Sequence, residues 1–82
     1  MEATRQPQIE DLMRGLGQRA LMLRLARGAN LYIAAAAIGV SPQTLGDIER
    51  GRRTPHAATL KAIADFYEVP VEALLDLPQD AA

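Results

Sequence analysis

Residues 30–53 read NLYIAAAAIGVSPQTLGDIERGRR, and this stretch decides the fold of the chain. Its first part, Leu31–Ile38, is small and apolar, and the Gly-Val-Ser turn at 39–41 interrupts it. Ser41 is a favourable N-cap, because its hydroxyl can accept hydrogen bonds from the free amides of the next turn. Pro42 then occupies the first helical position, where a missing N–H costs nothing. The stretch therefore predicts two short helices joined by a tight turn.

The second of these helices, predicted over Pro42–Arg50, divides into a buried face and an exposed face. Leu45 and Ile48 lie three residues apart and face the core, and Gly51 ends the helix. The outer face is left with Gln43, Thr44, Gly46, Asp47 and Arg50. An apolar helix, a glycine turn and a helix with a polar outer face indicate a helix-turn-helix. Such an outer face offers the hydrogen-bonding groups that base edges in a DNA major groove require.

The composition argues against several other classes of protein. The 82 residues, 49% of them hydrophobic, provide one compact core, with a stability that is marginal or shared with a partner subunit. There is no cysteine, and the single histidine, His56, is expected near a helix cap or on the surface. We therefore expect no disulfide, no metal site, no cofactor and no enzymatic nucleophile–base pair. Without a run of roughly 20 apolar residues or a signal pattern, we expect a cytoplasmic protein that is not in a membrane.

Charge is divided unevenly along the chain, although the formal net charge is only −1. Between Arg14 and Lys61 there are eight basic residues and two acids, which leaves this segment at +6. Residues 62–82 carry five acids and no lysine or arginine. Two interpretations are open. Either the clustering is a chance feature of a solvated surface, or one face of the domain meets a polyanion while the acidic end points away.

The spacing of apolar residues predicts a long helix before the helix-turn-helix. Residues 1–6 have no pattern and are expected to be disordered. From Gln8 to Arg27 the apolar positions recur at helical steps, and Gly28 ends the helix. Gly15 and Gly17 each weaken a helix interior by about 1 kcal/mol, so a break or kink is open there. The pattern is carried by Ile9, Leu12, Met13, Leu16, Ala20 and Leu23.

Two further helices are predicted after it. Apolar residues at i, i+3, i+4 and i+7 predict a helix over Ala57–Tyr67. A fifth, short helix ends before Pro78, and residues 79–82 are expected to be a frayed tail. A single helix-turn-helix domain is therefore expected over residues 7–78. The fifth helix is marked by Val71, Leu74 and Leu75.

Residues from about Leu16 to Leu77 closely resemble the lambda-repressor-like family of helix-turn-helix domains, also called Cro-type or XRE-type. The similarity is carried by LRLARGAN at 23–30, IGVSPQTLGDIERGRRTP at 38–55 and TLKAIADFYEVPVEALLDL at 59–77. The resemblance implies an all-α domain of five helices. It also implies that the domain binds double-stranded operator DNA, usually as a symmetric dimer.

The resemblance assigns roles to individual residues, with the helix at 42–50 as the recognition helix. Gln43 can bond adenine at N6 and N7, Thr44 can contact a thymine methyl or a phosphate, and Asp47 can accept from cytosine N4. The implied base-facing residues are Pro42, Gln43, Thr44 and Asp47. The implied phosphate-binding residues are Asn30, Arg50, Arg52 and Arg53, although Arg52 and Arg53 also fit a minor-groove contact or a plain surface loop.

Arg24 and Glu49 match a pair that forms an interhelical salt bridge in this family, where it ties the first helix to the recognition helix. The chain also departs from the family pattern. Leu31 stands where a glutamine usually touches phosphate, and alanines replace the polar residues common on the second helix. Gly46 lies inside the recognition helix, where it either allows close approach of the backbone to DNA or is simply tolerated.

The leading hypothesis is a sequence-specific transcriptional regulator, a repressor that binds a palindromic operator as a homodimer. The alternative is an antitoxin-like or adaptor module that has this fold but works mainly by binding a protein partner. Two surfaces are candidates for the dimer contact. One is Val71, Leu74, Leu75 and Leu77, and the other is Ile9, Met13, Leu21 and Met22.

Overall fold

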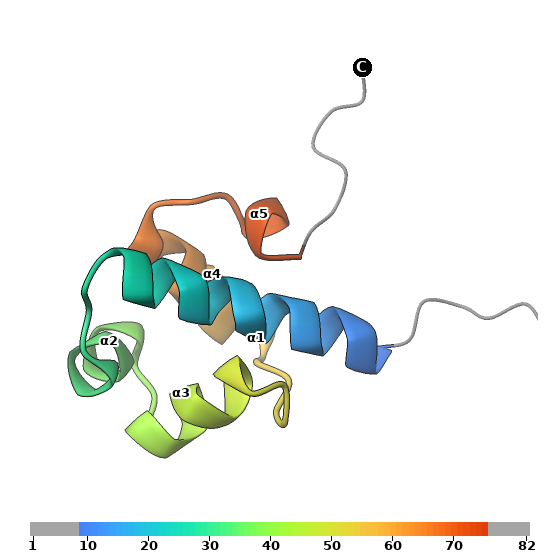
Figure 1. The fold of residues 1–82 in the computed structure, drawn as a ribbon, viewed down its shortest axis with the longest axis horizontal. Coiled ribbons are helices and arrows are strands. Elements are labelled where there is room, and N and C mark those ends of the chain that lie inside the picture. The colour runs from blue at the N-terminus through green and yellow to red at the C-terminus, as the bar shows by residue number, and fades with distance from the viewer. Residues whose placement is uncertain (1–8, 76–82) are drawn as a thin grey trace, which may run out of the picture.

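The computed structural model describes residues 9–75, with side chains from residue 14 onward, and these residues form five helices and no strand (Figure 1). In chain order the helices are α1 (Ile9–Ala26), α2 (Leu31–Ile38), α3 (Pro42–Glu49), α4 (Ala57–Tyr67) and α5 (Val71–Leu75). The predicted all-α fold of five helices is confirmed. The ends expected to be disordered or frayed, and the helix end expected before Pro78, lie outside the described residues.

The observed helix ends differ slightly from the predicted ones. The helix predicted to reach Arg27 ends at Ala26, and it is continuous through Gly15 and Gly17. The recognition helix ends at Glu49 instead of Arg50, because Arg50 is its C-cap and Gly51 takes the left-handed φ of 77° that turns the chain away.

Side-chain caps define the start of both helices of the helix-turn-helix. Asn30 Oδ1 accepts from the backbone nitrogens of Tyr32 and Ile33 at 2.7 and 3.3 Å, as the sequence predicts for the N-cap of α2. Ser41 Oγ accepts from the backbone nitrogen of Thr44 at 3.0 Å. Between them, Gly39 takes a φ of 99°, which allows the tight turn. These local contacts fix where the two helices begin.

One core joins all five helices. α1 packs on α3 and α5 and lies lengthwise across the domain, whereas α2 packs on α3 and α4 (Figure 1). The core-facing side of α3 is Leu45 and Ile48, both almost fully buried, as the sequence predicts. The other core residues are Leu16, Ala20, Ala34, Ala35, Ile38, Ile63, Ala64, Tyr67 and Leu74.

Gly17 allows α1 to lie directly against the C-terminal end of α3. A Cβ atom at this position would collide with the carbonyl oxygen of Ile48 and lie 2.7 Å from that of Glu49. Only glycine leaves room for these backbone carbonyls, because they are part of α3 and can shift only if the helix itself shifts. The glycine that weakens α1 locally therefore sets the distance between α1 and the recognition helix.

Tyr67 is the largest of the fully buried side chains in the described part of the chain. Within that part, its hydroxyl is the buried side-chain oxygen that no hydrogen-bond partner reaches. Burial, followed by the nearby charge of Glu49, raises the pKa of Tyr67 above its ordinary value of 10.0. Arg27 covers the ring, with Cζ 5.7 Å from the ring centroid, and Nη2 donates to the Tyr67 carbonyl at 2.7 Å. Arg27 thus packs over Tyr67 at the edge of the core.

Candidate nucleic-acid interface

The outer side of α3 gathers polar groups that sequence analysis expects to read DNA. Gln43 is exposed, Thr44 and Asp47 are half-buried, and Arg50 is exposed just past the last helical residue. Positions 43, 47 and 50 follow one another at helical spacing, so they share one side of the helix. Pro42 is half-buried at the N-terminal end of the same helix. The structure therefore places these residues together on and beside α3.

The cap of α3 also holds Thr44 in place. The Ser41 hydroxyl accepts from the Thr44 amide and donates to Thr44 Oγ1 at 2.9 Å. The Thr44 hydroxyl oxygen therefore accepts a hydrogen bond from the cap residue Ser41. Its O–H can still donate a hydrogen bond, and its methyl group can make apolar contacts.

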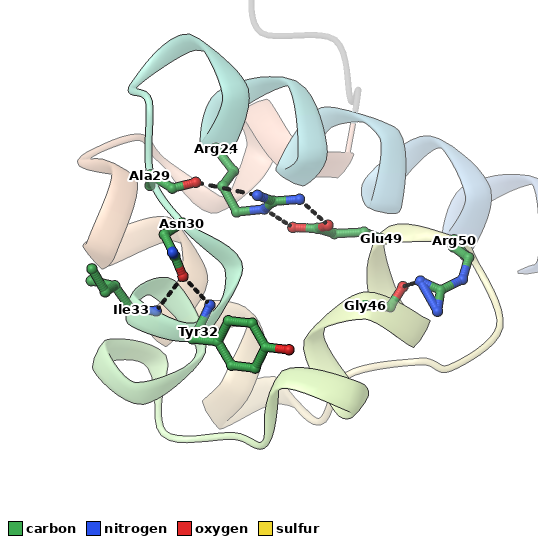
Figure 2. Close-up of polar contacts among 8 residues, drawn as sticks. All are labelled: Arg24, Ala29, Asn30, Tyr32, Ile33, Gly46, Glu49 and Arg50. Carbon is green, nitrogen blue, oxygen red and sulfur yellow. Dashed lines mark hydrogen bonds and ion pairs between the residues drawn. The ribbon is translucent and has the colours of Figure 1, made fainter.

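Arg50 folds back along α3. Its Nη1 donates to the carbonyl oxygen of Gly46 at 3.2 Å, as Figure 2 shows, and its Nη2 lies 3.9 Å from Asp47 Oδ1. The guanidinium thus lies beside the carboxylate that faces the same side of the helix. The two opposite charges offset each other on the outer side of α3.

Arg24 anchors the far end of α3 to the rest of the domain (Figure 2). Its Nε and Nη2 donate to Glu49 Oε2 and Oε1 at 2.8 and 3.0 Å, so the expected interhelical pair is present and bidentate. Nη1 also donates to the Ala29 carbonyl at 3.2 Å. The hydrogen bond to Glu49 is the main cause that raises the pKa of Arg24. One guanidinium therefore ties α1 to the end of α3 and to the loop that leads into α2.

The burial of Glu49 makes this anchor strong. The Glu49 side chain is 5% exposed, and Glu49 is the buried charged residue of the described chain. Such a carboxylate depends on its charge partner and its hydrogen bonds, because little water reaches it in the folded domain.

The residues expected to bind phosphate lie at the two ends of the helix-turn-helix. Asn30 uses Oδ1 to cap α2, so its side-chain NH₂ group remains available to donate hydrogen bonds. Arg52 and Arg53 are exposed in the loop after α3. The Arg52 backbone nitrogen donates to the Asp47 carbonyl at 2.8 Å, which holds the start of this loop against the recognition helix.

Sequence analysis did not single out Tyr32 and Ile33 on the first turn of α2. They are 68% and 65% exposed, and the Tyr32 ring projects on the side of α2 that faces α3, whereas Ile33 projects away (Figure 2). A signal was present in the spacing. The buried positions of α2 are 34, 35 and 38, and neither 32 nor 33 belongs to that stripe.

The structure removes one residue from the two predicted dimer surfaces. Leu74 is fully buried in the core of the single chain, so its side chain is not available to a partner. Val71, Leu75 and Leu21 are half-buried, while Leu77 and the side chains of Ile9 and Met13 lie outside the described residues. Met22 is 66% exposed and borders a groove of about 410 Å³ between α1 and the α4–α5 region. The groove is lined by Arg19, Met22, Leu23, Ala26, Val69 and Ala73.

Residues 14–75, whose side chains the structure describes, contain neither a metal-binding cluster nor a single membrane-spanning helix. No group of three or more His, Asp or Glu side chains is arranged there to hold a metal ion. No single helix in this part is long and apolar enough to cross a membrane. Arg14–Ala26 and Leu31–Ile38 satisfy length and composition only as a pair bent by 116°.

Comparison with known proteins places the chain among regulators of one type. A family model described as Helix-turn-helix matches residues 22–74. The HTH-type transcriptional regulator SutR of Escherichia coli (strain K12) is 41% identical over 73 residues, which is 89% of this chain and 41% of SutR. The chain spans less than half the length of SutR and of two further relatives that it matches.

Solved structures with the same fold agree with this comparison. The restriction-modification controller protein C.AhdI from Aeromonas hydrophila has a TM-score of 0.72 at 26% identity, over 76% of this chain and 94% of that chain. The DNA-binding domain of BldD has a TM-score of 0.72 at 28% identity, over 83% of this chain and 99% of that chain.

Proposed function

The chain belongs to the XRE-type helix-turn-helix family of transcriptional regulators, and from that premise we propose that it is a repressor that binds a palindromic operator as a homodimer. The observation that carries the proposal is the outer side of α3. Gln43 is exposed and Thr44 is half-buried at its N-terminal end, while the C-terminal end is anchored through Glu49. A recognition helix needs both properties, because base edges are read only when the helix keeps one orientation in the groove.

In this proposal α3 enters the major groove with its N-terminal end foremost. Gln43 reads adenine through its carboxamide, the Thr44 methyl packs on thymine, and Asp47 accepts from cytosine. Asn30 before α2 and the arginines after α3 bind phosphates on either side of the groove. The arginine contacts supply much of the affinity and make it dependent on salt.

A second copy of the chain is the expected partner. The groove beside Met22 and the half-buried Val71 and Leu75 offer apolar surface on the α1–α5 side of the domain. A two-fold axis through this surface would give two recognition helices, which read half-sites about 34 Å apart along the DNA. Occupation of an operator by such a dimer in the cytoplasm is sufficient for repression and needs no catalytic group.

Selection of bound sequences from a random duplex pool, at two salt concentrations, tests this proposal. We expect a palindromic motif with half-sites about one helical turn apart. Gln43→Ala should relax the preference at one base pair of each half-site, and Arg52→Ala should weaken all sequences alike and reduce the salt slope by about 0.9. Lys61→Ala on α4 is the charge-matched control, because Lys61 is paired with Asp65 at 3.0 Å. Failure to recover any motif would refute sequence-specific regulation.

An antitoxin-like or adaptor module is the second candidate, favoured by the exposure of Met22 and Leu25 on α1. Two large apolar side chains that are more than 60% exposed suit a protein partner as well as a second copy. The double variant Gln43→Ala/Arg52→Ala separates the two functions. If binding of a partner protein survives this double change while DNA binding is lost, the two roles are separate.

A further inference from the structure

Gly46 forms a notch in the recognition helix that the guanidinium of Arg50 fills. A Cβ atom at position 46 would lie 3.0 Å from Nη1, 3.5 Å from Nη2 and 3.7 Å from Cζ of Arg50. These are the three atoms nearest to such a Cβ. The guanidinium therefore lies in the space that a side chain at position 46 would enter, and it bonds to the Gly46 carbonyl (Figure 2).

Two contacts hold Arg50 in this place. Nη1 donates to the Gly46 carbonyl at 3.2 Å, and Nη2 faces Asp47 Oδ1 at 3.9 Å. The Arg50 side chain is nevertheless 56% exposed, so much of its donor edge remains open to solvent. An arginine that lies in a defined position before binding loses less rotamer freedom when it makes a contact.

We propose that Gly46 is a positioning residue for Arg50, which it allows to lie against α3 so that the guanidinium meets a DNA phosphate beside the bases read by Gln43. The proposal deepens the proposed function and rests on it. It also gives Asp47 a place at a DNA surface, because the neighbouring guanidinium offsets the repulsion between the carboxylate and phosphate. Gly46 thus acts on DNA through Arg50, without touching the DNA itself.

A double-mutant cycle on DNA affinity distinguishes this role from simple clearance for DNA. Wild type, Gly46→Ala, Arg50→Ala and the double variant are compared by fluorescence anisotropy on the operator duplex selected by the wild type. We expect Gly46→Ala and Arg50→Ala each to weaken binding about tenfold and to lower the salt slope by about 0.9. The double variant should bind no more weakly than Arg50→Ala alone, because Gly46 acts only through Arg50.

The melting temperatures of the same proteins separate the positioning role from a structural role. If Gly46 were needed for folding, Gly46→Ala would lower the melting temperature. Alanine is the better helix former, so Gly46→Ala should raise the melting temperature by about 4 °C while DNA affinity falls. Arg50→Lys, which keeps the charge and loses the planar fork, should bind nearly as weakly as Arg50→Ala. It serves as an independent test should Gly46→Ala lower stability instead.

Gly15 on α1 offers a matched control, since it has the same arrangement with Arg19. A Cβ there would lie 2.8 Å from Arg19 Nη1, which donates to the Gly15 carbonyl at 2.9 Å. Gly15→Ala should leave the salt slope of operator binding unchanged, because Arg19 lies on α1 and makes no phosphate contact in this proposal. Wild-type affinity in the Gly46→Ala variant, or an equal loss from Gly46→Ala in the Arg50→Ala background, would overturn the positioning role alone. Absence of operator binding by the wild type would overturn the proposed function as well.

Discussion

Removal of Arg24 should take away a large part of the stability of the domain. Arg24→Ala deletes two hydrogen bonds to Glu49 and one to the Ala29 carbonyl. It leaves the Glu49 carboxylate 5% exposed and without its charge partner. A buried charge left in this way costs about 3–5 kcal/mol. Because the Arg24 side chain is 14% exposed and water can enter the space that it leaves, we expect the lower end, about 3 kcal/mol.

That loss is large beside the total stability of so small a domain. At roughly 0.05–0.15 kcal/mol per residue, a chain of this length is stabilised by about 4–12 kcal/mol. The melting temperature should therefore fall by about 12–24 °C, measured by circular dichroism, with urea titration for the free energy. Lys61→Ala is the control, since the Lys61–Asp65 pair is exposed and its loss should change stability by about 0.5 kcal/mol or less.

A paired substitution separates the charge effect from lost packing. In Arg24→Met/Glu49→Leu both charges are replaced by apolar groups, so most of the 3 kcal/mol should return. A loss of less than about 1 kcal/mol in Arg24→Ala would refute the reasoning, because Glu49 would then be stabilised without Arg24. A paired variant as unstable as Arg24→Ala would show that the arginine acts by packing instead.

Three further predictions follow from particular contacts. Gly17→Ala should destabilise the domain by about 2–3 kcal/mol, because its Cβ collides with the Ile48 carbonyl, whereas Gly15→Ala should not; urea titration compares them. Tyr67→Phe should raise stability by about 1 kcal/mol, because it removes a buried hydroxyl that has no partner among the described residues. Since burial raises the pKa of Tyr67, the wild type should also lose stability as the pH rises above 10, and Tyr67→Phe should lose less between pH 7 and 11. Tyr32→Phe should weaken operator binding about fivefold without changing the salt slope, because its exposed hydroxyl carries no charge; an unchanged affinity would exclude Tyr32 from the interface.

Helix caps and turns are the features of the fold that the sequence predicts best. Asn30 and Ser41 cap the helices they were expected to cap, and the turn after Gly39 lies where three small residues interrupt the apolar run. Capping and left-handed turns depend on groups within three or four residues of one another, so sequence order is enough to identify them. The Arg24–Glu49 contact came from family resemblance, since its partners are 25 residues apart.

Contacts between distant segments were the part that sequence reasoning missed. Gly17 was weighed only as a weak point in a helix, because its role depends on carbonyls 31 and 32 positions away. Leu74 was assigned to a dimer surface, but it is buried within one chain. Both a core and an interface require apolar side chains, so the pattern of a short helix does not distinguish them. Gly46 was left open between close approach to DNA and simple tolerance, because sequence order does not show that the Arg50 side chain folds back over it.

The contacts that hold α3 and the groups that it presents are separated along its length. Gly17 and Arg24 act on the last turn, through backbone carbonyls and Glu49, whereas Gln43 and Thr44 stand on the first turn and take no part in the core. Substitution at the first turn should therefore change base preference with little effect on stability, since it breaks no buried contact. Arg50 follows the last turn, and its side chain folds back along α3. It leans on Gly46 and Asp47 without being buried, so its position depends on α3 alone and not on the packing of the domain. A recognition helix built in this way can change its target sequence through its own residues, while α1 continues to fix its orientation.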